Sequence, residues 1–122
     1  MNIGKRINSQ PQLRIVSMPY FVYVIKLDKE VLKSKKFRKA NPTMKRRKAC
    51  LYVGQTCHDP EIRFQQHKQG YKSNGFVKRF GLKLKPRIYH KYNPIKTRKE
   101  AEIVEQQLTE KLRNKGYGVW SN

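Results

Sequence analysis

Two short runs of β-branched and aromatic residues constrain the fold of this chain most strongly. They cover residues 20–27 (YFVYVIKL) and 50–55 (CLYVGQ). Each run is short and rich in residues that favour strands, so each predicts a strand packed into the core. A loop can return the chain from the first strand to the second without a crossover helix, so we expect the two to pair antiparallel.

Helix signals follow the second predicted strand. Asp59 supplies an N-cap side chain and Pro60 fits the first helical position, which predicts a helix from residue 60 to about residue 68, before Gly70. A second short helix is predicted over residues 73–80, where apolar residues recur at helical spacing.

The longest predicted helix begins at Thr97. Thr97 and Glu100 have the spacing of a capping box, apolar residues then recur every three or four positions, and Gly116 ends the pattern. Ahead of this helix, residues 87–92 (RIYHKY) alternate between charged and apolar residues, which predicts a third, half-buried strand. The chain therefore combines three predicted strands with helices.

The charge balance indicates the kind of partner. The chain has 122 residues, with 29 Lys and Arg against 8 Asp and Glu, for a net charge of +21. So much uncompensated charge favours a polyanionic partner, and nucleic acid is the leading one. The length suits one domain over residues 19–122, preceded by a flexible basic arm at residues 1–18.

The densest charge lies in a basic insert at residues 28–49. It holds ten Lys or Arg and two acids, and ten minus two leaves +8. Two interpretations stay open, a solvated loop or an excursion that contacts DNA, and the overall charge favours contact. The predicted nucleic-acid-binding residues are Lys45, Arg46, Arg47 and Lys48 in the insert, then Lys78 and Arg79, with Lys83 and Lys85 as further candidates.

Several classes of protein are excluded by what the sequence lacks. No apolar run approaches the roughly 18 residues that span a bilayer, and no signal-peptide core is present, so we expect a soluble, intracellular (cytoplasmic) protein without a membrane partner. Cys50 and Cys57 are expected to be reduced thiols, and their spacing to the histidines does not suit zinc. The sequence contains no glycine-rich phosphate-binding loop, so it gives no support to nucleotide hydrolysis.

Five polar residues are candidates for chemistry. Glu105 lies within the apolar stripe of the last helix, so it should meet a cation, accept hydrogen bonds or bind a metal; the plainer alternative is a stripe-edge glutamate paired with a lysine. Arg63 and His67 are four residues apart on one helix face and can converge on a phosphate, or be ordinary surface residues. Tyr23 and Tyr52 lie mid-strand, where packed core tyrosines are also common.

Taken in order, these residues resemble the GIY-YIG nuclease family. The resemblance rests on Phe21-Val22-Tyr23 in the first strand, residues 52–56 (YVGQT) in the second, Arg63 with His67, and Glu105 within EAEIVE, and it covers residues 20–122. Phe21 stands where the first motif usually has glycine. The gap between the two tyrosines, 52 minus 23 or 29 positions, is longer than in most members and is similar to that of restriction-enzyme members of the family, while a free-standing homing or repair-type nuclease stays open as an alternative.

The resemblance implies an α+β fold in which a small three-stranded, mainly antiparallel sheet is flanked by helices. It also implies a metal-dependent endonuclease that hydrolyses phosphodiester bonds in DNA, with one divalent metal, Mg²⁺ or Mn²⁺, bound by Glu105. A homodimer is expected for cutting both strands.

The family pattern also implies a role for each site residue. Tyr23 and Tyr52 line the site and one of them helps to activate the attacking water, Arg63 steadies the phosphate, and His67 assists proton transfer. A tyrosine is a poor base near pH 7, so neighbouring positive charge from Arg63, a lysine or the metal must favour its phenolate. Two further candidate site residues are Gln55 and Asn122.

The main alternative is a non-catalytic basic domain that binds nucleic acid, such as an RNA-binding or ribosome-associated protein. Glu105 discriminates between the two, because a pure binder gains nothing from a buried acid, whereas a metal-dependent nuclease needs a ligand there.

Overall fold

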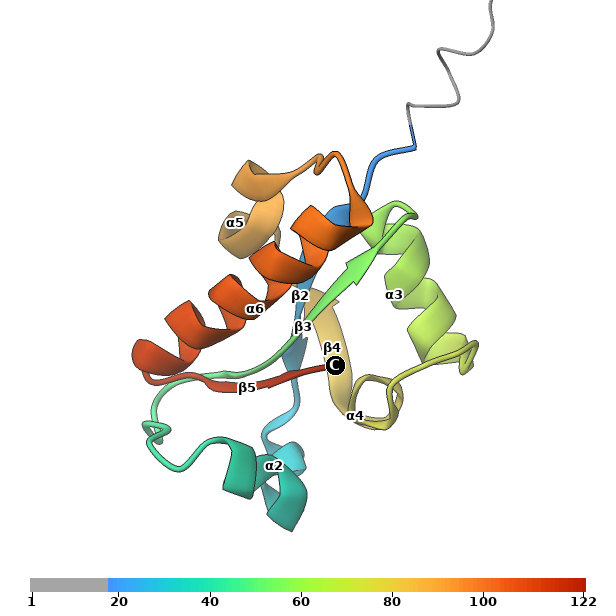
Figure 1. Cartoon of the computed structure of the whole chain (residues 1–122). Helices are drawn as coiled ribbons and strands as arrows, with labels where there is room; N and C mark the ends of the chain where they lie inside the picture. Colours follow the sequence, from blue (N-terminus) through green and yellow to red (C-terminus); the bar gives the residue numbers. More distant parts are fainter. Residues whose placement is uncertain (1–17) are drawn as a thin grey trace, which may run out of the picture.

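A computed structural model describes residues 18–122, which fold around one sheet (Figure 1). The predicted arm at residues 1–18 lies outside the described residues apart from Met18. The elements, in chain order, are β2 (Phe21–Leu27), η1 (Lys29–Lys33), α2 (Lys35–Ala40), β3 (Cys50–Thr56), α3 (Pro60–Gln69), α4 (Gly75–Phe80), β4 (Gly81–Leu84), α5 (Pro86–Tyr89), η2 (His90–Tyr92), α6 (Arg98–Asn114) and β5 (Gly118–Ser121).

The sheet has four strands in the described residues, in the order β4-β2-β3-β5. β2 and β3 pair antiparallel from Phe21 opposite Thr56 to Leu27 opposite Cys50, which confirms the first two predicted strands. β4 adds antiparallel to β2, whereas β5 runs parallel to β3, with α6 as part of the crossover that a parallel pair needs. The α+β class is confirmed, but the expectation of a three-stranded, mainly antiparallel sheet is wrong, because the sheet is mixed.

The predicted third strand at residues 87–92 is wrong, because this segment forms α5 and η2. Pro86 occupies the start of α5, where its fixed φ suits a helix and its missing N–H costs nothing. Ile88, Tyr89 and Tyr92 face inward at helical spacing, whereas a strand would have turned the exposed His90 to the same face as Ile88. The strands β4 and β5, each of four residues, were not predicted.

The helices predicted from their capping residues are confirmed. An Asp59 carboxylate oxygen accepts the N–H of Glu61 at 2.9 Å at the start of α3, and Gly70 ends that helix with a φ of 89°. The Thr97 hydroxyl accepts the N–H of Glu100 at 3.1 Å at the start of α6. The short helix expected within residues 73–80 is α4.

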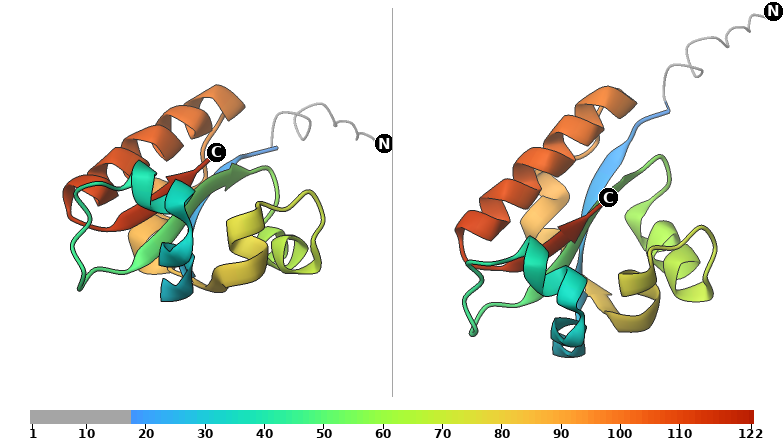
Figure 2. Two further views of the ribbon diagram at one scale, coloured as in Figure 1. Left: turned by 90° about the horizontal axis from the view of Figure 1, so that it is seen from below. Right: turned by 60° about the horizontal axis from the view of Figure 1, so that its bottom comes forward.

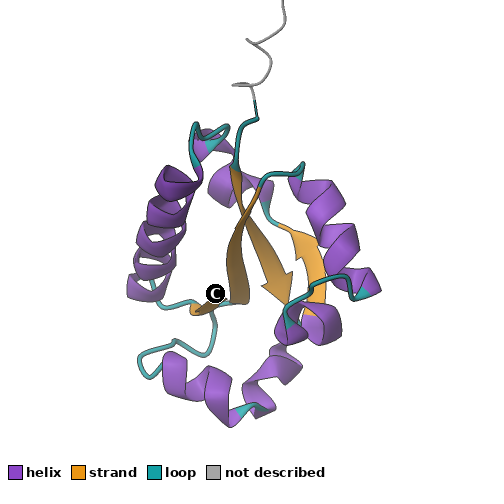
Figure 3. Cartoon of the chain, turned by 45° about the vertical axis from the view of Figure 1, so that its right-hand side comes forward, coloured by secondary structure: helices purple, strands orange, loops and turns teal. Residues whose placement is uncertain are grey.

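Helices flank the strands on two sides, and Figure 3 shows α6 along one side and α3 along the other. α6 packs on β3 and β5, while α3 and α4 pack on β2 and β4. The core lies between these layers and is built on side chains of the two central strands that are at most 1% exposed, namely Val22, Tyr23, Val24, Ile25 and Leu27 of β2 with Cys50, Leu51, Tyr52 and Val53 of β3.

The basic insert at residues 28–49 is folded against the core rather than being a solvated loop throughout. Val31 of η1 and Phe37 of α2 are fully buried. Asn41 fixes the end of α2 to β5, because its side-chain oxygen accepts the N–H of Val119 at 2.8 Å and that of the Arg113 guanidinium at 3.1 Å. The two views in Figure 2 show α2 beside β5. The insert therefore presents its cations from a supported surface.

The state of the cysteines and the lack of a membrane-spanning segment, both expected from the sequence, can be compared with the described residues. Both cysteines are free, Cys50 buried and Cys57 exposed. None of the helices formed by residues 18–122 is both long and apolar enough to cross a bilayer.

Candidate active site

Tyr23 and Tyr52 lie side by side on the two central strands. Alternation along each strand places both on the same face of the sheet, together with Gly54, which pairs with Tyr23. Their ring centroids are 6.1 Å apart, and each residue is 1% exposed. The two tyrosines therefore meet in one buried cluster and also belong to the core.

His67 joins the tyrosines from the last turn of α3. Its Nε2 lies 2.9 Å from the Tyr23 hydroxyl oxygen, and its Nδ1 accepts the backbone N–H of Asn74 at 3.2 Å. A neutral imidazole carries one proton, so the ring that accepts at Nδ1 must carry its proton on Nε2. His67 thus donates to Tyr23, and the loop before α4 sets its tautomer.

Glu105 completes the cluster from α6, where it is 7% exposed. In the described part of the chain no Lys, Arg or His nitrogen lies within 4.0 Å of its carboxylate, so the alternative of a lysine-paired glutamate is wrong there. Burial raises the pKa of Glu105 to about 7, against a hydrogen bond from the Asn122 backbone that lowers it. The carboxyl group therefore holds its proton to a higher pH than an exposed glutamate does, and no cation of residues 18–122 lies within 4.0 Å to stabilise its charge.

Arg63 is half-buried on α3, one turn before His67. Its guanidinium donates to the Lys72 carbonyl at 2.8 Å, to the Tyr71 carbonyl at 3.2 Å and to the Gln66 side chain at 3.1 Å. The loop after α3 curls these carbonyls onto the arginine, with Lys72 at a φ of 42°. Of the five guanidinium donors, two are free of protein partners in the described residues, which leaves part of the fork for an anion.

Burial, rather than charge, dominates the ionisation of the cluster. It raises the pKa of Tyr52 to about 12 and the pKa of Tyr23 further above its ordinary value, and the Arg63 charge opposes both shifts. Burial and then Arg63 lower the pKa of His67 to about 4. Both tyrosines and His67 are therefore neutral at pH 7 in the free protein, and Arg63 alone does not produce the phenolate.

Asn122 ties Tyr52 into a hydrogen-bond network. Its Nδ2 donates to the Tyr52 hydroxyl oxygen at 2.6 Å, and its Oδ1 accepts from Asn74 Nδ2 at 3.2 Å. Each tyrosine oxygen thus accepts a hydrogen bond from a protein donor, His67 for Tyr23 and Asn122 for Tyr52. Accepted hydrogen bonds favour the deprotonated phenol and work against burial.

One candidate residue, Gln55, lies outside the cluster, and one residue that supports the cluster, Asn74, was not a candidate. Gln55 is half-exposed and, one residue after Gly54, points to the opposite face of the sheet from Tyr52, so the structure does not bring it into the cluster. Asn74 was missed, although it holds both His67 and Asn122. Its position before a short helix indicates only an N-cap, and that is also one of its functions, because its side chain accepts the N–H of Phe76 at 2.8 Å.

The predicted nucleic-acid-binding residues are on the surface, in two groups. Lys45, Arg46 and Arg47 are exposed and Lys48 is half-exposed, in the segment before β3. Lys45 and Lys48 also pack on the end of α6, since the Lys45 stem covers Gly116 and the Lys48 ammonium lies 4.7 Å from the centre of the Tyr117 ring. The second group, Lys78 and Arg79, is exposed on α4, the helix that follows Asn74.

A divalent metal can be tested against the donors present. The described residues contain no group of three or more His, Cys, Asp or Glu that could enclose an ion. Mg²⁺ is often bound by only one or two carboxylates, with water and substrate phosphate oxygens completing its shell. Glu105 fits that kind of site, because it is a buried carboxylate and no cation of the described residues lies within 4.0 Å of it.

The chain belongs to the GIY-YIG family. The family model of the GIY-YIG catalytic domain matches residues 19–118, most of the chain, which includes Tyr23, Tyr52, Arg63, His67 and Glu105. This membership makes the domain that of a nuclease, a phosphodiester hydrolase that acts on nucleic acid. Asn122 lies beyond the matched residues. Searches of curated proteins and of solved structures gave no significant match.

Proposed function

We propose that this chain is a divalent-metal-dependent endonuclease that hydrolyses phosphodiester bonds in DNA. The observation that carries the proposal is Glu105, a buried carboxylate with no cation within 4.0 Å in the described residues, close enough to Tyr23 and Tyr52 for its charge to raise the pKa of both. Burial of such a group costs stability, so its presence indicates a functional requirement. The net charge of +21 supports a polyanionic substrate.

Each residue of the cluster has a physical role in this proposal. Hydrolysis forms a bond from the water oxygen to phosphorus, breaks the bond to the leaving oxygen, and releases a proton from the water. The free donors of Arg63 would bind the phosphate oxygens as negative charge develops on them. Glu105 would hold Mg²⁺ or Mn²⁺, which supplies further positive charge at the phosphate when it is bound.

Tyr23 and Tyr52 are the candidates for accepting the proton of the water. Both are neutral in the free protein, so positive charge brought to the site must favour the phenolate over the buried phenol. His67 Nε2–H then stabilises the Tyr23 oxygen and Asn122 Nδ2–H the Tyr52 oxygen. A chain of this size has one such cluster in its described residues, so we further propose that a homodimer cuts both strands.

The test is cleavage of supercoiled plasmid by the purified chain with Mg²⁺, with Mn²⁺ and with EDTA. We expect nicked and then linear DNA with either metal and no product in EDTA. Glu105→Gln should lose cleavage and keep DNA binding, because it replaces an anionic ligand by a neutral isostere. Glu102→Gln, on an exposed position of the same helix, is the matched control and should cut normally.

Two results would overturn the assignment. Cutting by Glu105→Gln at the wild-type rate would remove Glu105 from the site. Tight binding of DNA or RNA with no cleavage in any metal would instead favour the alternative, a non-catalytic nucleic-acid-binding domain.

A further inference from the structure

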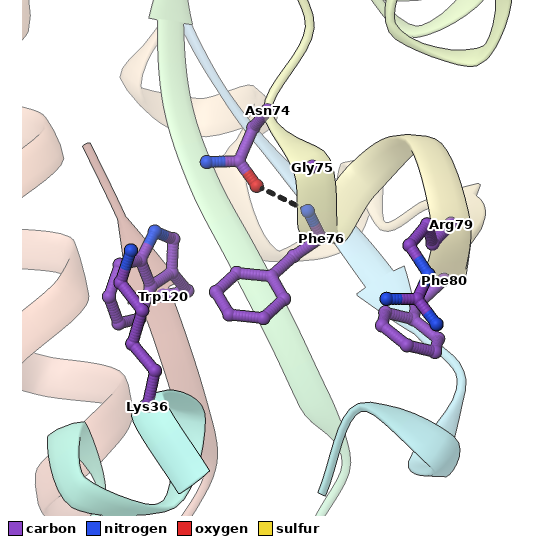
Figure 4. Close-up of a pocket in the computed structure, with 7 residues that line it drawn as sticks. All are labelled: Lys36, Asn74, Gly75, Phe76, Arg79, Phe80 and Trp120. Carbon is purple, nitrogen blue, oxygen red and sulfur yellow. Dashed lines mark hydrogen bonds between the residues drawn. The ribbon is translucent and has the colours of Figure 1, made fainter. Parts of the chain in front are cut away.

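A pocket of about 240 Å³ opens beside the cluster, between α2, α4 and β5. Figure 4 shows Phe76 between Trp120 on one side and Phe80 with Arg79 on the other, with Asn74 above it. Lys36 of α2 closes the side next to Trp120. The three aromatic residues are each only half-buried, so they present ring surface to the pocket rather than being sealed in the core.

Aromatic rings and cations alternate along the wall of this pocket. Trp120 and Phe76 meet edge to face with centroids 5.0 Å apart, which holds the indole in place. The Lys36 ammonium lies 5.1 Å from the centre of the Trp120 ring, and the Arg79 guanidinium lies 4.9 Å from that of Phe80. Aromatic faces that stack bases, flanked by cations that contact phosphates, are what single-stranded nucleic acid binds.

The pocket shares a wall with the catalytic cluster. Asn74 lines the pocket and donates through its side chain to Asn122, which in turn donates to the Tyr52 hydroxyl oxygen. The backbone N–H of Asn74 also holds His67. One residue therefore separates the aromatic wall from the side chains that would act on the phosphate.

We propose that this pocket binds an unstacked nucleobase of the DNA strand being cut, from a nucleotide close to the cleaved phosphate. The base stacks against Trp120, and Lys36 and Arg79 contact the flanking phosphates. The inference rests on the proposed function, since it concerns the substrate of the same site. A base must leave the duplex stack to enter, and this costs least where DNA is mismatched or already single-stranded. The enzyme should therefore prefer DNA with an unpaired base beside the cut.

The chain provides its own probe, because Trp120 is the one tryptophan in the sequence. The purified chain is titrated in EDTA, so that no cleavage occurs, with an end-labelled single-stranded DNA oligonucleotide and with an oligonucleotide of the same length made of abasic sites. Anisotropy of the label reports binding, and intrinsic fluorescence reports contact with Trp120. We expect both strands to bind and only the strand with bases to quench the tryptophan.

A plug variant tests the pocket without disturbing the fold. Gly75 lines the pocket, and a Cβ added there meets no atom within 4 Å, so Gly75→Leu places a side chain in open space. It should abolish the base-dependent quenching and weaken binding of the base-containing strand by at least about fivefold, the lower end of the loss of one stacked base. Gly75→Ala is the matched control and should change both by much less.

The outcomes separate this inference from the proposed function. Equal quenching by both strands, binding without quenching, absence of binding, or unchanged quenching in Gly75→Leu would each overturn the base pocket. Base-dependent quenching that Gly75→Leu removes, in a protein that does not cut plasmid, would support the base site and overturn the nuclease. Plasmid cleavage without base-dependent quenching would support the nuclease and overturn the base pocket.

Discussion

Tyr23 and Gly54 face each other across the antiparallel pair of β2 and β3, and the Tyr23 ring occupies the space that a side chain on Gly54 would need. A Cβ added at Gly54 would lie 2.6 Å from both Cζ and the hydroxyl oxygen of Tyr23, and 3.0 Å from Cε2 of Tyr52. The absence of a side chain at this position therefore lets both tyrosines converge. Gly54, the glycine of the YVGQT segment, is thus needed for the geometry of the site.

Gly54→Ala should accordingly damage both stability and cleavage. The added methyl group collides with two buried rings, and overpacking of this kind costs about 1–3 kcal/mol. We expect a lower thermal midpoint and a slower single-turnover rate, because the Tyr23 hydroxyl must move away from His67. Gly75→Ala, where the added Cβ meets nothing within 4 Å, is the control. A normal midpoint and rate in Gly54→Ala would show that the close approach has no consequence.

Glu105 should make the metal-free protein less stable as the pH rises. Its pKa of about 7 in the folded chain exceeds its ordinary value of 4.5, so the folded state binds this proton more tightly than the unfolded state does. The stabilisation from that proton is complete below pH 4.5 and is lost as the pH rises through 7. Glu105→Gln stays neutral, so at pH 8 its free energy of unfolding should exceed that of wild type by up to about 3 kcal/mol. Its thermal midpoint should be correspondingly higher.

The measurement is a pair of thermal melts in EDTA at pH 5 and pH 8. The advantage of Glu105→Gln should shrink toward pH 5, where the wild-type carboxyl is itself protonated. Glu110→Gln, an exposed position of the same helix that does not contribute to the Glu105 shift, should show no such pH-dependent difference. A Glu105→Gln protein that is less stable than wild type at pH 8 would mean that the carboxylate is compensated in the folded chain.

Arg63→Ala should lower turnover far more than affinity. Loss of one positioned donor to a developing oxyanion typically costs about 10²–10³ in rate, whereas one phosphate contact among many contributes little to binding. Arg63→Lys should recover little, because lysine keeps the charge without the fork that binds the carbonyls of Tyr71 and Lys72. Single-turnover rates with Mg²⁺ and dissociation constants in EDTA separate the two effects. Equal losses in both would make Arg63 a DNA contact only.

The basic segment before β3 should contribute salt-dependent affinity. Arg46→Ala/Arg47→Ala removes two exposed charges and spares Lys45 and Lys48, which pack on Gly116 and Tyr117. The slope of log affinity against log salt should flatten by up to about 0.9 per lost contact on duplex DNA, with an unchanged thermal midpoint. Lys96→Ala/Lys99→Ala removes the same charge elsewhere and is the control. An unchanged slope would place the DNA contacts outside this segment.

The sequence was sufficient for the elements whose signals are local. Capping residues and apolar spacing identified α3, α4 and α6, and the two β-rich runs identified β2 and β3. The prediction for residues 87–92 was wrong because the mixture of charged and apolar residues was interpreted as alternation, whereas Ile88, Tyr89 and Tyr92 have helical spacing and Pro86 suits the start of a helix. β4 and β5 have four residues each, too few for a periodic signal, and exist because β2 and β3 offer free edges.

The site was predictable to the extent that the family motifs mark it. The structure brings Tyr23, Tyr52 and His67 together, with Arg63 close enough to shift the pKa of each of them and Glu105 close enough to shift the pKa of both tyrosines, while the roles of these residues stay predictions. The protonation states could not be read from the sequence, because they depend on burial. Asn74 could not be found either, since its contacts arise from a loop that only tertiary structure places beside β5.

The parallel pairing of β5 with β3 makes the order of synthesis matter. Tyr23 leaves the ribosome early. Tyr52, in contrast, can accept the hydrogen bond from Asn122 only after Asn122 has been synthesised and β5 has paired with β3. The cations of residues 28–49 are complete long before that point. A chain in which β5 is not paired with β3 thus carries the cations of residues 28–49 without the hydrogen bond from Asn122 to Tyr52, so the pairing of β5 completes this part of the site.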